Sequence, residues 1–218
     1  MMKTLNKGLF ITVEGGDGSG KSTLVKRLKN HFINKDLSCI TVRNPGGYGI
    51  NEQLRNILLS NDDIDGVSRT LLNLTCIHNN IVNIIKPALD KNTIVISDRY
   101  LLTTYAYQCV AENIPLDKFK QMVDFISENT YANIEIILSV DPSIGLSRVP
   151  KNKRNVIEAK GLEYHTIVNS AFINNSYINN NNNTCTYIVN TNTLSKDMTF
   201  STVCSNIESY IKRKELDK

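Results

Sequence analysis

The sequence predicts an α/β protein in which a five-stranded parallel sheet is flanked by helices. Short apolar runs rich in isoleucine and valine recur along the chain, and longer amphipathic patterns separate them. The runs do not alternate strictly between apolar and polar residues, which is typical of strands buried on both faces of a parallel sheet. With 218 residues, of which 41% are hydrophobic, the chain has the length and composition of one such domain.

The predicted elements alternate along the chain. The apolar runs predict strands at 9–14, 38–42, 93–97, 134–140 and 187–189. Apolar residues spaced three and four apart predict helices at 21–33, 50–59, 67–89 and 198–213. We interpret the asparagine-rich stretch 174–183 as a polar loop that carries no chemistry.

Composition narrows the range of functions. The net charge of +4 is unclustered and suits a basic phosphate pocket, so we expect no nucleic-acid partner. No run approaches the roughly 18 apolar residues of a membrane span, and the N-terminus carries no evident secretory signal. These features predict a cytoplasmic protein without a membrane partner. The cysteines are scattered without a Cys-x-x-Cys pair, which argues against disulfides and a zinc site.

A glycine-rich loop directly after the first predicted strand is the most specific motif. It fits the pattern G-x-x-x-x-G-K-[ST] and reads Gly15, Gly16, Asp17, Gly18, Ser19, Gly20, Lys21, Ser22 and Thr23. The glycines let the backbone curl around a phosphate, and the following helix directs its positive dipole end at the anion. We expect Lys21 at the β and γ oxygens of the nucleotide and the Ser22 hydroxyl on Mg²⁺. The motif therefore predicts a P-loop NTPase fold, but it does not separate a kinase from a GTPase, a motor or a repair ATPase.

A second candidate site follows the third predicted strand, where the chain reads Asp98-Arg99-Tyr100. The carboxyl end of this strand should lie beside the phosphate-binding loop. There, Asp98 can hold a Mg²⁺-bound water or orient an acceptor, and Arg99 can clamp a phosphate. The simpler interpretation is a surface ion pair at the end of a strand.

Together with these motifs, several segments resemble the thymidylate kinases of the bacterial type, from Phe10 to the C-terminal helix. The segments are FITVEGGDGSGKST, RNPGG, EQLRNILL, IKPAL, DRYLLTTYAYQ, SVDPSIGLSR and RNVIEAKGLEYH, in the order and spacing of the family. The resemblance implies a single nucleoside monophosphate kinase domain over residues 1–218, with a short mobile lid at about 149–160. It also implies transfer of a phosphoryl group from ATP·Mg²⁺ to dTMP, which yields dTDP for dTTP biosynthesis, and a homodimer.

The same resemblance implies roles for individual acceptor-site residues. Asp17 corresponds to the acidic residue that binds the 3′-hydroxyl of the acceptor sugar, and Arg99 to the arginine that holds the acceptor phosphate. The other positions are Arg55 at the edge of the thymine, Thr104 facing the base, Tyr107 under the sugar, and Gln108 beside that tyrosine.

Catalysis is expected to depend on alignment and charge, because the acceptor phosphate is itself the nucleophile and needs no general base. The candidates are Lys21, Asp98, Arg99 and one lid arginine, Arg148 or Arg154, with Ser22 and Asp98 on the metal. Closure of the lid would bring that arginine onto the transferring group and expel water.

Some positions depart from the family pattern. Asn73 and Ile77 stand where the family carries a phenylalanine that stacks on thymine and an arginine on the acceptor phosphate, and we expect both to face the acceptor cleft. Asn44 replaces a glutamate, Leu102 an aspartate and Val156 an arginine. Two alternatives therefore stay open: a kinase for another small nucleotide acceptor, and a non-catalytic nucleotide-binding descendant.

Overall fold

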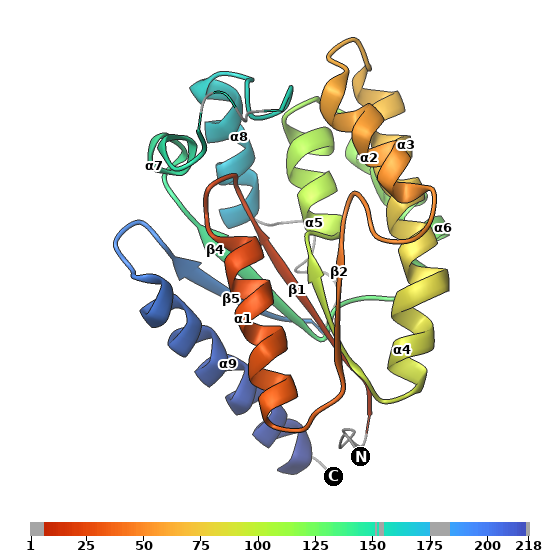
Figure 1. The fold of residues 1–218 in the computed structure, drawn as a ribbon. Helices are drawn as coiled ribbons and strands as arrows, with labels where there is room; N and C mark the ends of the chain where they lie inside the picture. Colours follow the sequence, from red (N-terminus) through yellow and green to blue (C-terminus); the bar gives the residue numbers. More distant parts are fainter. Residues whose placement is uncertain (1–6, 151, 153–154, 175–183, 217–218) are drawn as a thin grey trace.

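The strands form one parallel sheet in the computed structural model, which describes residues 7–150, 152, 155–174 and 184–216 (Figure 1). Within these residues, five strands lie in the order β2-β3-β1-β4-β5, and each pair of neighbours is parallel. The strands are β1 (Leu9–Gly15), β2 (Cys39–Arg43), β3 (Ile94–Asp98), β4 (Ile134–Ser139) and β5 (Cys185–Asn190). The predicted five-stranded parallel sheet is confirmed.

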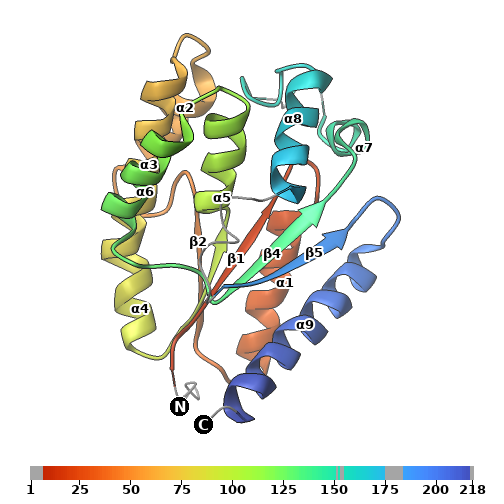
Figure 2. The same ribbon diagram turned by 180° about the vertical axis from the view of Figure 1, so that it is seen from behind.

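Helices cover both faces of the sheet (Figures 1 and 2). On one face lie α1 (Lys21–Asn34) and α9 (Lys196–Leu216), while α4 (Lys86–Asp90), α5 (Leu101–Thr104) and α8 (Leu162–Ile173) contact the other. The remaining helices are α2 (Asn51–Ser60), α3 (Gly66–Asn80), α6 (Leu116–Ser127), α7 (Pro142–Ser147) and the π-helical stretches η1 (Ile81–Ile85) and η2 (Tyr105–Val110). No helix in these described ranges is long and apolar enough to cross a membrane.

The predicted helix at 67–89 is one continuous rod with a π-helical stretch in it. It comprises α3, η1 and α4, and the wider turn begins where the backbone hydrogen bonds change their spacing after Asn80. The helices predicted from the apolar spacing did not include α5, η2, α6, α7 or α8. The polar stretch 174–183 is outside the described residues except for Asn174, which ends α8.

Side chains of β1 to β4 enter two separate cores on the two faces of the sheet, while β5 contributes to one of them only. Phe10, Val95 and Ile137 belong to the core under α3, α6 and α8. Their chain neighbours, such as Ile11 and Ile96, belong to the core under α1 and α9. Burial on both faces explains why the strands appear in the sequence as continuous apolar runs. Because all five strands are parallel, the polar residues at their carboxyl ends gather at one edge of the sheet.

Candidate active site

The phosphate-binding loop connects β1 to α1 and packs closely on α7. Gly18 has a φ of 72°, and a Cβ at this position would lie 1.9 Å from the carbonyl oxygen of Gly145. Only glycine fits there, because a side chain would have both the wrong backbone conformation and no room. The Nζ of Lys21 donates to the carbonyl of Gly16 at 2.7 Å inside the loop. Burial lowers the pKa of Lys21 to about 8, and neighbouring Arg99 lowers it as well.

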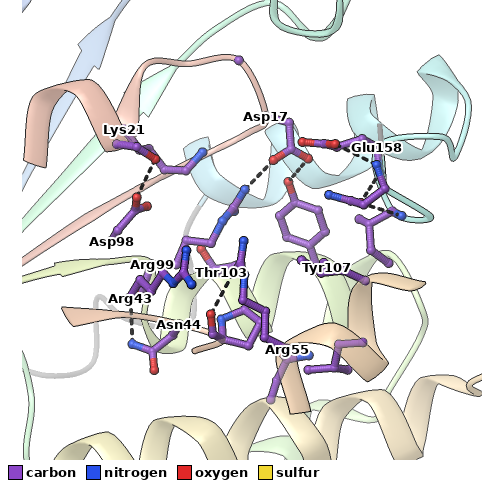
Figure 3. A pocket seen from close by; sticks show the side chains of 18 of the residues that line it. Asp17, Lys21, Arg43, Asn44, Arg55, Asp98, Arg99, Thr103, Tyr107 and Glu158 are labelled. Carbon is purple, nitrogen blue, oxygen red and sulfur yellow. Dashed lines mark hydrogen bonds and ion pairs between the residues drawn. The ribbon is translucent and has the colours of Figure 1, made fainter. Parts of the chain in front are cut away.

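Ser22 and Asp98 meet beside this loop. The Oγ of Ser22 donates to Oδ2 of Asp98 at 2.7 Å, across the boundary between α1 and β3 (Figure 3). A hydroxyl and a carboxylate are oxygen ligands of the kind that Mg²⁺ accepts directly or through water. The residues therefore fit the predicted metal.

Asp17 lies between Arg99 and Tyr107 (Figure 3). A guanidinium nitrogen of Arg99 donates to Oδ1 of Asp17, and the hydroxyl of Tyr107 donates to Oδ2 at 2.9 Å. The Nδ1 of His165 lies 3.9 Å from the same Oδ2. Burial raises the pKa of Asp17, but Arg99 and Lys21 outweigh it and hold the pKa below its ordinary value. Asp17 is therefore an ionised carboxylate held from both sides.

Beneath the loop, Glu14 is fully buried at the end of β1. The hydroxyl of Thr103 donates to its Oε2, while its Oε1 has no hydrogen-bond partner in the described part of the chain. Burial raises the pKa of Glu14 to about 7. No role was predicted for Glu14, because a residue inside a strand is expected to be part of the sheet.

Most of these groups line one cavity of about 840 Å³, but Glu14 and His165 do not. It contains twelve predicted site residues: Asp17, Gly18, Gly20, Lys21, Ser22, Thr23, Arg55, Asp98, Arg99, Tyr107, Gln108 and Arg148. Gly15, Gly16 and Ser19 lie in the loop but do not line the cavity. Thr104 is buried, and its neighbour Thr103 lines the cavity instead. Arg154 lies outside the described residues.

Other residues line the cavity although they were not predicted as site residues. They include Arg43, Asn44, Pro45, Arg69, Thr103, Glu158 and Lys196. Arg43 to Pro45 could have been found, because they lie at the carboxyl end of β2 and parallel strands end at the same edge of the sheet. Arg55 from α2 reaches this loop and donates to the carbonyl of Pro45 at 2.8 Å.

Asn44 is held by a buried network of amides. Its Nδ2 donates to the Oγ of Ser97 and to the carbonyl of Arg99, both at 3.0 Å. Its Oδ1 accepts from the Nδ2 of Asn80 at 2.8 Å, and Asn51 donates to the Oδ1 of Asn80 at 3.2 Å. The network shows how a neutral asparagine is satisfied at this position, and it fixes the loop against the end of β3.

Of the two unusual helix residues, only Asn73 lines the cavity. Its Nδ2 donates to the carbonyl of Arg69 at 2.9 Å. Ile77 is 1% exposed and packs in the apolar core. The expectation that both residues face the acceptor cleft is therefore wrong for Ile77. Residues four positions apart on a helix lie on roughly the same face but do not point in the same direction. Here Asn73 points to the cleft side of that face and Ile77 to the core side.

Arg148 holds the opposite end of the cavity together. Its guanidinium donates to the carbonyls of Gly18 at 3.2 Å, Thr191 at 3.0 Å and Asn192 at 3.4 Å. It also lines a smaller adjoining cavity of about 290 Å³, together with Leu194 and residues of the phosphate-binding loop. In this geometry Arg148 joins the loop to the segment after β5, and its role in transfer stays a prediction.

Comparison with known proteins places these features in a family. The family model described as thymidylate kinase matches residues 13–198. The thymidylate kinase of Protochlamydia amoebophila is 36% identical over 184 residues, which cover 79% of this chain and 82% of that protein. The thymidylate kinase of Clostridium novyi is 31% identical over 173 residues, with coverages of 77% and 84%.

A solved structure agrees with these sequence matches. The crystal structure of thymidylate kinase from Ehrlichia chaffeensis aligns with a TM-score of 0.74 and 26% identity. The alignment covers 93% of this chain and 99% of the other. The match confirms the predicted P-loop NTPase fold, and together with the family model and the sequence relatives it shows that the chain belongs to the thymidylate kinase family.

Proposed function

We propose that this protein is a kinase that transfers the γ-phosphoryl group of ATP to the phosphate of dTMP, a step of nucleotide biosynthesis. The observation that carries the proposal is Asp17. It belongs to the phosphate-binding loop, yet its carboxylate faces Arg99 and Tyr107 on the other side of the cavity. One loop thus contacts both substrates, which is the arrangement that direct transfer between them requires.

On the donor side, residues 15–23 cradle the phosphates of ATP, and Lys21 lies at the β and γ oxygens. Mg²⁺ would be held by Ser22 and Asp98, with the phosphates and water as its other ligands, and would neutralise charge on the transferring group. The smaller cavity beside Arg148 has the position and the partly apolar lining that the adenine of the donor needs.

On the acceptor side, Tyr107 and Asp17 are placed to meet the sugar, and Gln108 the base. Gln108 is 4% exposed and lines the cavity. A carboxamide can donate to one thymine carbonyl and accept from the neighbouring ring N–H at the same time.

Transfer of the phosphoryl group then requires charged side chains that align the acceptor phosphate with the γ-phosphoryl group of ATP. Arg99 moves from Asp17 to the acceptor phosphate and holds it in line with the γ-phosphoryl group, while Lys21 stabilises the charge that develops on the oxygens. No residue is needed to remove a proton, because the nucleophile is an ionised phosphate oxygen.

We further propose a lid over residues 149–160 on a single domain, and a homodimer. Support for the dimer comes from large exposed apolar side chains on α3 and η1, which form one continuous rod, and on α6, which contacts α3. Val67 is 56% exposed, Leu71 49%, Val82 42% and Phe125 86%. Exposed apolar residues gathered on adjacent elements are typical of a surface that a second copy covers.

The deciding experiment measures ADP formation with dTMP, dUMP, dCMP, dGMP and AMP as separate acceptors. We expect dTMP to give the highest kcat/KM. Clear preference for another monophosphate would favour a kinase with a rebuilt acceptor pocket. Binding of ATP without ADP release in any of the five reactions would favour a non-catalytic descendant.

A further inference from the structure

Three separate parts of the chain converge on the carboxylate of Glu112, just after η2. Its Oε1 accepts a hydrogen bond from the Nζ of Lys160 at 2.7 Å and one from the hydroxyl of Tyr164 at 3.4 Å. The same oxygen lies 3.6 Å from the Nε of Arg69. The side chain of Glu112 is only 11% exposed, so these contacts are formed largely away from water and their charge matters more than at the surface.

Arg69 fixes Glu112 to the wall of the cavity that α2 and α3 form. Its guanidinium is 2% exposed and donates to the carbonyls of Leu58 at 2.9 Å, Ile64 at 3.1 Å and Asn61 at 3.4 Å. Its Nε has no hydrogen-bond partner among the described residues. The buried charge therefore depends on Glu112 for its counter-charge, because an unpaired buried guanidinium is strongly unfavourable.

Lys160 connects a second wall of the cavity to the same carboxylate of Glu112. Lys160 is the last residue of the turn 155–160, which two reciprocal hydrogen bonds stabilise. The backbone N–H of Asn155 donates to Oε2 of Glu158, and the backbone N–H of Glu158 donates to Oδ1 of Asn155, both at 3.0 Å. Asn155, Ile157 and Glu158 line the cavity. The Nα of Val156 reaches α2 and donates to the carbonyl of Leu59 at 3.3 Å.

We infer that Glu112 is a positioning residue that fastens the turn 155–160 to the α2–α3 wall through Lys160 and so sets the shape of the acceptor end of the cavity. The identity of the molecule that fills this end rests on the proposed function. Glu112 and Lys160 do not line the cavity. They act through Asn155, Ile157 and Glu158, which do.

The test compares two lysines that form ion pairs of similar length. Lys160→Met removes the charge of Lys160 and keeps its length, and Lys160→Arg restores the charge. Lys86→Met is the control, since Lys86 pairs with Glu128 at 2.6 Å on the exposed side of α4. Hydrogen exchange at the amide of Val156 reports the docking of the turn without any substrate. Steady-state kinetics report its consequence for each substrate.

We expect Lys160→Met to speed exchange at Val156 about tenfold and to raise the acceptor KM about five- to tenfold, as for loss of one charged hydrogen bond. KM for ATP and kcat should change less than about twofold, because the donor contacts are untouched. Lys160→Arg should recover most of both effects, and Lys86→Met should show neither. In the double variant Glu112→Gln plus Lys160→Met, the lysine substitution should add little, because its partner is already gone.

Unchanged exchange at Val156 in Lys160→Met would overturn the inference, whichever acceptor the enzyme prefers. Faster exchange with equal rises in both KM values would also overturn it, because the turn would then act on the whole fold. The exchange measurement needs no acceptor, so failure of dTMP as substrate is a separate outcome that bears on the proposed function alone.

Discussion

The Oγ of Ser22 donates a 2.7 Å hydrogen bond to Oδ2 of Asp98, and this contact ties the first turn of α1 to the end of β3. The two oxygens come from neighbouring elements of the sheet edge, on either side of the phosphate-binding loop. Their separation is set by the register of β1 with β3, in which Val13 is opposite Asp98. The sheet therefore preorganises the two oxygens that we propose as metal ligands.

Replacing the carboxylate of Asp98 should weaken the binding of Mg²⁺ more than the binding of the nucleotide. In Asp98→Asn the shape is kept and the charge is lost, so we expect the Mg²⁺ concentration for half-maximal activity to rise roughly tenfold or more. The measurement is a Mg²⁺ titration of activity at saturating substrates. Asp90→Asn, at the exposed end of α4, is the control. An unchanged titration curve would remove Asp98 from the metal site.

Asp17→Asn should weaken the binding of the acceptor and leave the binding of ATP nearly unchanged. The carboxylate contacts Arg99 and Tyr107, so its loss should remove the proposed contact to the acceptor sugar and leave the loop backbone in place. We expect the acceptor KM to rise roughly tenfold and KM for ATP to stay within about twofold. Asp62→Asn, on the exposed loop before α3, is the control. Equal rises in both KM values would mean that Asp17 only shapes the loop.

Asn73→Phe should improve acceptor binding. Asn73 lines the cavity, and an aromatic ring there can stack on a base, which contributes about 0.5–1.5 kcal/mol. We therefore expect the KM for dTMP to fall roughly two- to tenfold. The fall should extend to dUMP, because stacking does not depend on the methyl group. A higher KM for both would show that the ring blocks the pocket.

Ile77→Arg should destabilise the fold instead of adding a phosphate contact. Ile77 is 1% exposed in an apolar core, and an unpaired charge there costs roughly 3–5 kcal/mol. Thermal or urea unfolding measures the loss, and Ile77→Leu should cost less than about 1.5 kcal/mol. An Ile77→Arg protein of unchanged stability with a lower acceptor KM would restore the expectation that this residue faces the cleft.

Ionisation of Glu14 should lower the free energy of unfolding as the pH rises. Burial raises its pKa from 4.5 to about 7 in the folded state, so the folded protein holds this proton more tightly than the unfolded chain. The contribution is fully present below pH 4.5 and is lost as pH rises through about 7, a change on the order of 1–3 kcal/mol. Glu14→Gln cannot titrate, so the difference in unfolding free energy between variant and wild type should grow from pH 5 to pH 8. A constant difference would contradict the assignment.

Local patterns predicted the features that depend on neighbouring residues. The phosphate-binding loop follows from nine consecutive residues between a strand and a helix, and Asp98 lies beside it because parallel strands end together. Both are properties of the backbone, which the sequence determines over short distances.

Side-chain direction and pairing over long distances were harder to predict. Thr103, and not Thr104, lines the cavity, because one step along a helix turns a side chain by about 100°. The position of Ile77 was predicted wrongly because apolar residues at helical spacing can line either the cleft or the core, and the spacing alone does not separate the two. The burial of Arg69 depends on Glu112, which is distant in the chain and pairs with it only in the fold. No local pattern carries that information.

The pairing with Asp17 limits which anions Arg99 can bind. The carboxylate gives Arg99 a counter-charge through its Oδ1. An anion that binds the guanidinium therefore competes with this carboxylate, and its apparent affinity is reduced in proportion to the fraction of molecules in which Arg99 is free. A ligand that also offers a hydroxyl group to Asp17 should meet less of this competition than a bare anion of the same charge.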